Sequence, residues 1–293
     1  MATPAGRLPD NAPGEFYVDR TCIDCDACRR IAPAVFEEGG GHSFVRAQPG
    51  TRQARRRALM ALVACPTGSI GASSPAGAAA AAAAFPETVD ENVSFCGFTS
   101  ESSFGAWSYF IERAAGNVLV DSPRAAGPLL SALEARGGVR ALFLTHRDDV
   151  ADHEALRKRF GCERVLHEDD VTASTRGVER RLAGREPVRL ADDLVAIPTP
   201  GHTRGHAVLL YREKYLFTGD HLAWSRRGGH LVAFRDACWY SWDAQIGSME
   251  RLLDFRFEWV LPGHGGWHHA ASAEAMRAEV ERCVAWMRTA SRR

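Results

Sequence analysis

Residues 145–153 read THRDDVADH and directly follow the apolar run ALFL at residues 141–144. A short apolar run bounded by polar residues predicts a buried β-strand, so we expect the loop to begin where a strand ends. The loop offers two imidazoles and three carboxylates. Imidazole nitrogens and carboxylate oxygens bind divalent metals. The stretch therefore predicts a metal-binding loop at the end of a strand.

Three further stretches place potential metal ligands after predicted strands. They read TPGHTRGH from residue 199, FTGDHL from residue 217 and LPGHGGWHH from residue 261. Because loops at the ends of neighbouring strands meet at one edge of an α/β fold, we expect their polar side chains to converge. The candidate ligands in these stretches are His202, Asp220 and His264.

In this order, the four stretches resemble the motif series of the metallo-β-lactamase superfamily, which is H-x-H-x-D-H, then G-H-T, G-D and P-G-H. The resemblance covers residues 94–290 and implies an α/β fold of the αββα sandwich type over residues 94–293. It implies a first metal ion held by His146, His202 and Asp220. It implies a second ion held by Asp152, His153, His264 and the shared Asp220.

The loop departs from this motif in two ways. Two extra residues separate His146 from the Asp152–His153 pair. In addition, Asp148 stands where the family has its second histidine, with Asp149 as the alternative, and flavodiiron members of the superfamily carry a glutamate there. A carboxylate is a harder ligand than an imidazole, which favours iron or manganese over zinc. We therefore expect one or two divalent ions, iron or zinc, with Asp148 among the ligands of the first.

The N-terminal part carries four cysteines in the spacing of an iron–sulfur site. Three form a CxxCxxC triplet and the fourth lies in a distant Cys-Pro pair; they are Cys22, Cys25, Cys28 and Cys65. The pattern resembles bacterial-type ferredoxins over residues 15–72 and implies a [4Fe-4S] cluster on the four thiolates. The residue that serves a second cluster in two-cluster ferredoxins is Ala32 here, so a single cluster is expected. A structural zinc site is the alternative, although zinc ribbons pair CxxC with CxxC.

A low-complexity segment separates these two parts. Residues 73–93 are rich in alanine and proline, which predicts a linker that is helical in part at most. After it, short apolar runs alternate with stretches of helical periodicity. We expect a small α+β ferredoxin-like domain, a linker and an α/β domain. The predicted strands are 117–120, 141–144, 194–197, 207–211 and 259–261, and the predicted helices are 125–134, 150–160, 243–253 and 273–287.

The overall charge excludes some classes of partner. Lys+Arg and Asp+Glu both number 36, so no net field attracts nucleic acid or an anionic membrane. Apolar runs stay far below the ~20 residues of a membrane span, and the first residues lack a signal-peptide pattern, so we expect a cytoplasmic protein. The arginine-rich stretch 52–57 is either a solvated helix face or a docking surface for an acidic redox partner.

The resemblance implies hydrolysis of a small-molecule thioester, ester, lactone or amide by a metal-activated hydroxide. In this reaction the resemblance implies that Asp220 bridges the two metal ions and that Asp152 accepts the proton that the attack releases. A fused ferredoxin has no part in simple hydrolysis, which leaves a non-haem iron oxidoreductase supplied by the cluster as the alternative. A third option is an electron carrier with a degenerate hydrolase domain. The aromatic stretch CWYSW at residues 238–242 is either part of the core or a wall of an apolar substrate pocket.

Overall fold

The structure is a computed structural model and describes residues 1–290. The chain forms two compact units, one made of residues 1–141 with 151–162 and the other of residues 142–150 with the chain from residue 163 onward. In the part that the structure describes, none of the helices combines the length and the apolar character needed to cross a lipid bilayer.

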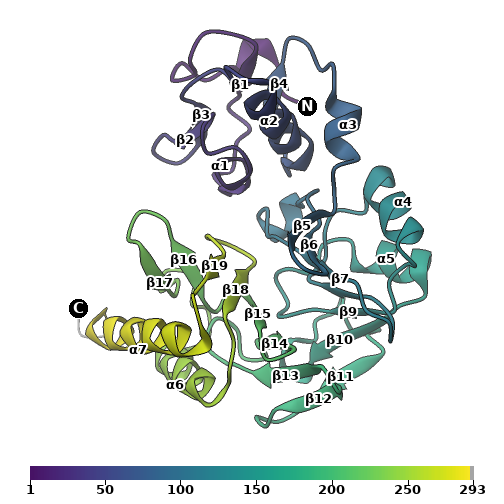
Figure 1. The fold of residues 1–293 in the computed structure, drawn as a ribbon, viewed down its shortest axis with the longest axis vertical. Helices are drawn as coiled ribbons and strands as arrows, with labels where there is room; N and C mark the ends of the chain where they lie inside the picture. Colours follow the sequence, from purple (N-terminus) through teal and green to yellow (C-terminus); the bar gives the residue numbers. More distant parts are fainter. Residues whose placement is uncertain (291–293) are drawn as a thin grey trace. The chain divides into compact units, whose positions relative to one another are not determined.

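The cysteine-rich N-terminal part of the first unit is a small α+β fold (Figure 1). Its elements are η1 (Pro4–Gly6), β1 (Phe16–Val18), α1 (Ala27–Ile31), β2 (Phe36–Glu38), β3 (Ser43–Val45), α2 (Arg52–Ala64) and β4 (Ile70–Ala72). Strand β1 pairs antiparallel with β4, and β2 pairs antiparallel with β3. Thr51 caps α2 by accepting a hydrogen bond from the Ala54 amide at 3.1 Å. Helix α2 buries Leu59 and Met60 in the core of this part.

The structure differs from the predicted linker and from the predicted start of the first domain. Residues before 15 are folded, since the buried side chain of Asn11 hydrogen-bonds the backbone of Val18. Within the predicted linker 73–93, α3 (Ala78–Ala82) forms on the alanine run and β5 (Glu87–Asp90) pairs antiparallel with the next strand. Alanine favours helix, and the pairing of β5 is a tertiary contact that composition does not reveal.

The rest of the first unit is an antiparallel meander with two helices. Its elements are β5, β6 (Val93–Phe95), η2 (Glu101–Ser103), β7 (Tyr109–Ile111), β8 (Val118–Val120), α4 (Gly127–Ala135) and α5 (His153–Phe160). Strands β6, β7 and β8 pair in sequence order, and all their residues are buried. The helix predicted over residues 150–160 begins later, at His153.

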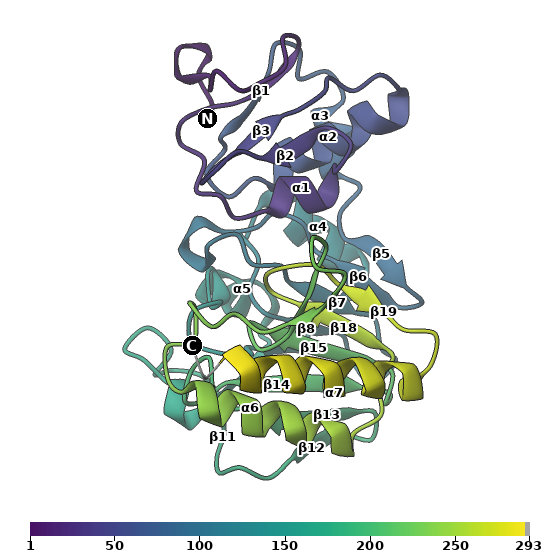
Figure 2. The same cartoon turned by 90° about the vertical axis from the view of Figure 1, so that its left-hand side faces the viewer.

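The second unit contains a mixed sheet with two helices packed on it. Its elements are β9 (Ala141–Phe143), β10 (Glu163–His167), η3 (Glu168–Asp170), β11 (Arg180–Leu182), β12 (Val188–Ala191), β13 (Leu194–Pro198), β14 (Ala207–Tyr211), β15 (Tyr215–Gly219), β16 (Ala223–Ser225), β17 (His230–Val232), α6 (Trp242–Arg251), η4 (Leu252–Asp254), β18 (Trp259–Pro262), β19 (His268–His269) and α7 (Ala273–Ala290). The order of the larger sheet is β12-β13-β14-β15-β18-β19. Helices α6 and α7 run side by side (Figure 2). Their side chains Met249, Met276 and Val280 are buried in the core.

The strand order of the second unit brings candidate ligands to one edge. Strands β15 and β18 are parallel neighbours with Gly219 opposite Pro262. The residues that follow, Asp220 and His264, therefore leave the sheet at the same edge. The connection between β13 and β14 carries His202, and the loop after β9 carries the THRDD segment.

Candidate metal centre and cluster site

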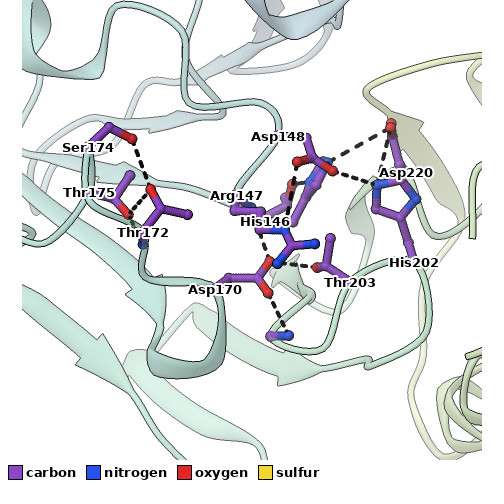
Figure 3. Close-up of polar contacts among 12 residues, drawn as sticks. His146, Arg147, Asp148, Asp170, Thr172, Ser174, Thr175, His202, Thr203 and Asp220 are labelled. Atoms are coloured by element: carbon purple, nitrogen blue, oxygen red, sulfur yellow. Dashed lines mark hydrogen bonds and ion pairs between the residues drawn. The ribbon is translucent and has the colours of Figure 1, made fainter. Parts of the chain in front are cut away.

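Four donor atoms face one another in the second unit. Asp148 Oδ2 lies 3.4 Å from His202 Nε2 and 3.9 Å from His146 Nε2. Asp220 Oδ2 lies 3.8 Å from His202 Nε2 and 3.9 Å from His146 Nε2. Figure 3 shows the four side chains pointing toward one another. Ligands about 2.1 Å from a tetrahedral metal lie about 3.4 Å apart, so these four nitrogen–oxygen distances are close to those around one ion.

The two histidines of this group each present a ring nitrogen that a metal could bind. The Nε2 atoms of His146 and His202 are buried and have no hydrogen-bond partner among the described residues. Unsatisfied buried nitrogens are costly, and a bound cation removes that cost. The Thr145 hydroxyl lies 2.9 Å from His146 Nδ1, which leaves Nε2 to face the site. Burial lowers the pKa of His146 to about 4, despite the nearby Asp220, so its ring is neutral at pH 7.

The two carboxylates of the group differ in exposure. Asp220 is buried, and although burial opposes its ionisation, His264 holds the pKa of Asp220 below the usual range. His202 likewise holds the pKa of Asp148 below the usual range. The Asp148 side chain is 43% exposed, whereas the side chain of His202 is 2% exposed. The donor group is therefore open to solvent on the side of Asp148.

Asp149 lies in the same cluster of donors. One of its carboxylate oxygens is within 4.8 Å of donor atoms of His146 and Asp220, and the residue is buried. A Cβ atom on Gly263 would lie 2.8 Å from Asp149 Oδ2 and 3.0 Å from Asp220 Oδ1. Two carboxylates thus face the space that this glycine leaves open. Asp220 presents Oδ2 to the histidines and Oδ1 to the side of Asp149. Sequence reasoning ranked Asp149 behind its neighbour and missed this placement.

Asp170 ties together the loops that carry the two histidines (Figure 3). Its carboxylate accepts hydrogen bonds from the Arg147 amide at 3.0 Å, the Thr203 hydroxyl at 2.5 Å and the Gly205 amide at 2.7 Å. These bonds fix the backbone on both sides of the donor group. The motif pattern does not contain Asp170, and its signal in the sequence is the acidic turn EDD at residues 168–170 after an apolar run.

The other three predicted ligands have contacts of their own. Asp152 Oδ2 accepts a hydrogen bond from the Ala125 amide at 2.8 Å. His153 is buried and is the first residue of α5. His264 Nδ1 donates to Asp220 Oδ1 at 2.7 Å. Metal binding by Asp152, His153 and His264 therefore remains a prediction. Among the described residues, the side chains grouped closely enough to hold an ion are His146, Asp148, Asp149, His202 and Asp220.

Two further histidines are buried next to this group. The His206 ring stacks at 5.2 Å on that of His146, and the His221 ring lies 5.5 Å beyond it. Burial lowers the pKa of His221 to about 3, so this ring is neutral. By contrast, His268 Nε2 lies 2.7 Å from the Glu279 carboxylate.

The four cysteines of the N-terminal part line one small cavity together with apolar side chains. The Ser43 amide donates to Cys22 Sγ at 3.4 Å, and the Ser69 amide donates to Cys65 Sγ at 3.3 Å. Such donors stabilise the negative charge of cluster sulfurs. Burial raises the pKa of the Cys25 thiol to about 11. At neutral pH this thiol therefore keeps its proton until a bound metal displaces it. The cavity therefore fits a thiolate-bound cluster.

Residues 99–107 of the same unit cover the Cys25 side of this cavity. A Cβ atom on Gly105, which has φ +79°, would lie 2.7 Å from Cys25 Sγ, so a side chain does not fit here. The Arg30 guanidinium lies 4.0 Å from the centre of the Trp107 ring. The covering segment thus packs directly on the cysteine loop.

Hydrogen bonds also join the end of α2 to the meander of the first unit. The Thr99 hydroxyl donates to the Ala64 carbonyl at 2.8 Å, and Arg124 donates to the Val63 carbonyl at 3.0 Å. The residue after Arg124 is the one that donates to Asp152. The cluster-binding part is therefore built into the first unit.

Two arginines of the predicted docking surface have partners within the first unit. Arg55 is paired with Glu15 at 2.7 Å, and Arg57 donates to the Ile31 carbonyl at 2.7 Å. Their charges are already used inside the fold, which favours the interpretation as a solvated, internally paired helix face.

Sequence comparisons find a family match and curated relatives. Residues 18–72 match the family described as the 4Fe-4S single cluster domain of Ferredoxin I. The hydroxyacylglutathione hydrolase of Rhizobium etli is 35% identical over 108 residues, which are 35% of this chain and 41% of that protein. The hydroxyacylglutathione hydrolase of Rhizobium meliloti is 32% identical over 127 residues, which are 42% of this chain and 49% of that protein. The chain thus spans half or less of the length of these curated relatives.

Comparison with solved structures identifies the fold. A crystal structure of the DIM-1 metallo-β-lactamase has a TM-score of 0.51 to this chain at 18% identity, covering 67% of this chain and 96% of that one. The predictions of a single [4Fe-4S] cluster and of the α/β class are confirmed. Residues 18–72 therefore form a single-cluster [4Fe-4S] ferredoxin domain, and a metallo-β-lactamase fold follows it.

Proposed function

We propose that the chain is a metal-dependent hydrolase that cleaves a small acyl compound, with a thioester as the first candidate. The observation that carries this proposal is the convergence of two imidazoles and two carboxylates on one point of the second unit. A mixed nitrogen and oxygen set suits zinc, iron and manganese. The residues that would hold the ion are His146, Asp148, His202 and Asp220.

A divalent ion bound here would supply a hydroxide near neutral pH. Buried Asp220, which is held in place by a hydrogen bond from His264, would balance the charge of the cation. Asp148 is the carboxylate that water and substrate reach, so it can accept the proton that the attack releases. The family resemblance gives this proton to Asp152, but one oxygen of Asp152 is already hydrogen-bonded to a backbone amide. We therefore assign the proton to Asp148.

The relatives support the choice of a thioester, because hydroxyacylglutathione is the compound in their name. That support is limited to the shared stretch, so an ester, lactone or amide stays in the set of candidate substrates. All of these substrates are small molecules with a carbonyl carbon that a hydroxide attacks.

The second candidate function is that of a non-haem iron oxidoreductase. Two histidines with one carboxylate and open positions form the usual site of non-haem iron oxygenases, and His146, His202 and Asp148 offer that set. The [4Fe-4S] domain in the same chain would supply electrons. Activity that requires iron, a reductant and an intact cluster would favour this function, whereas zinc-supported turnover without a reductant favours the hydrolase.

His146→Ala is expected to lower bound metal and to reduce thioester hydrolysis about 100-fold or more, because an essential donor is lost. The measurement combines elemental analysis with hydrolysis of a 2-hydroxyacyl glutathione thioester by anaerobically prepared protein. His264→Ala and His153→Ala should each remove metal as well if these residues are ligands. His268→Ala is the matched control, since His268 is paired with Glu279. Wild-type metal content in the His146 variant would contradict the assignment.

A further inference from the structure

The segment before α6 is fixed to the loop that carries His202. The backbone amides of Trp239 and Tyr240 both donate to the His202 carbonyl, at 2.9 and 3.1 Å. The Cys238 thiol and the Ser241 amide both donate to the carbonyl of the preceding glycine, at 3.2 and 3.0 Å. The position of this segment is therefore set by a candidate metal ligand.

The aromatic residues of this segment divide between core and surface. Trp242 packs against the core of the second unit, and its indole N–H donates to the Met287 carbonyl at 3.3 Å. Trp239 is 62% exposed and Tyr240 is 47% exposed. An exposed Trp and Tyr side by side offer apolar area that a ligand can cover at low entropic cost. In the stretch CWYSW, Trp242 is therefore part of the core, whereas Trp239 and Tyr240 are available to a ligand.

The exposed Trp239 ring lies beside the donor group. The Trp239 ring centroid is 6.2 Å from that of His202, and Asp148, the exposed donor, lies 3.4 Å from His202 Nε2. An acyl compound whose carbonyl reaches the donor group extends its acyl chain from that point. A ring in contact with His202 is within reach of the first atoms of that chain.

We propose that Trp239 and Tyr240 form the subsite for a flat apolar acyl group, such as an aryl-acetyl group, in the substrate. This inference rests on the proposed function for the location of the carbonyl. Aromatic pairs attract each other beyond the area they bury, so the two rings would select an aryl group over a methyl group. The two residues thus determine specificity and leave metal binding to the donor group.

The test is the affinity of the full-length, metal-loaded protein for phenylacetate and for acetate, measured by calorimetry under anaerobic conditions. Phenylacetate is expected to bind at least tenfold more tightly than acetate. Trp239→Ala should remove most of this preference without changing metal content, and Trp239→Phe should retain it. Trp286→Ala is the matched control, because Trp286 is an exposed tryptophan on α7.

The outcomes separate this inference from the proposed function. Equal affinities in the wild type, or an undiminished preference in Trp239→Ala, would overturn the subsite. Loss of metal in Trp239→Ala, with both acids weakened alike, would show a purely structural role for the segment and would overturn it too. Failure of the proposed function would give a different result: the metal-loaded wild type would hydrolyse no thioester but would still prefer phenylacetate to acetate.

Discussion

Replacing Cys25 with alanine is expected to remove the brown colour of the anaerobically purified protein and most of the roughly four irons and four sulfides of its cluster. The effect should extend beyond the ferredoxin domain, because Gly105 packs on Cys25 and Thr99 is bonded to the carbonyl before Cys65. Since cluster binding contributes directly to folding, the first unit should unfold about 10 °C lower.

Hydrogen exchange is the measurement that locates this loss. Amides at residues 99–107 and 124–126 should exchange faster in Cys25→Ala, because their packing and hydrogen bonds end on the cysteine loop and on α2. Cys96→Ala is the matched control: Cys96 is a buried thiol of the same unit that lies outside the cysteine cavity. Retained colour in Cys25→Ala would refute the cluster, and unchanged exchange at residues 99–107 would show that the covering segment holds without it.

Sequence predicts well those helices and strands that are determined by the pattern of their own residues. Strand β14 has the predicted bounds 207–211, because five buried apolar residues stand between polar turns. Helix α7 begins at Ala273 as predicted, since its apolar residues recur at helical spacing. Strand β5 was missed, because Glu87–Asp90 has no apolar signal and becomes a strand through its neighbour.

The candidate site divides in the same way. The residue types and the order of the four stretches follow from sequence, because each ligand stands at a fixed offset from a strand. The choice between neighbouring carboxylates in the THRDDVADH loop does not, since two inserted residues change the direction of each side chain after His146. The support from Asp170 is also a tertiary effect, because three donors from two separate loops meet its carboxylate.

Asp149→Ala is expected to lower the metal content about as much as Asp148→Ala, whereas the sequence pattern offers Asp149 only as the alternative to Asp148. The reason is its placement: Asp149 is buried, and its carboxylate shares the space beside Gly263 with Asp220 Oδ1. Two buried carboxylates at such close range repel each other, and a cation between them would offset this repulsion. We therefore expect Asp149 and Asp220 to contribute to a second cation position.

Gly263→Ala tests that position without removing any ligand. The added methyl group would lie 2.8 Å from Asp149 Oδ2 and 3.0 Å from Asp220 Oδ1, so it should exclude a second ion and leave the first on the histidines. We expect metal content to fall from about two ions to about one per chain, on the basis that each ion needs its own donor set. Elemental analysis of protein grown with equal iron and zinc measures this.

The same analysis distinguishes the roles of the neighbouring aspartates. Asp148→His should raise zinc relative to iron, because it restores a nitrogen-rich set, whereas Asp149→Ala should lower the total. Asp169→Ala is the control, since Asp169 is a nearby carboxylate paired with Arg204. Wild-type metal content in both Asp149→Ala and Gly263→Ala, together with loss of metal in Asp152→Ala, would return the second position to the ligand set of the family pattern.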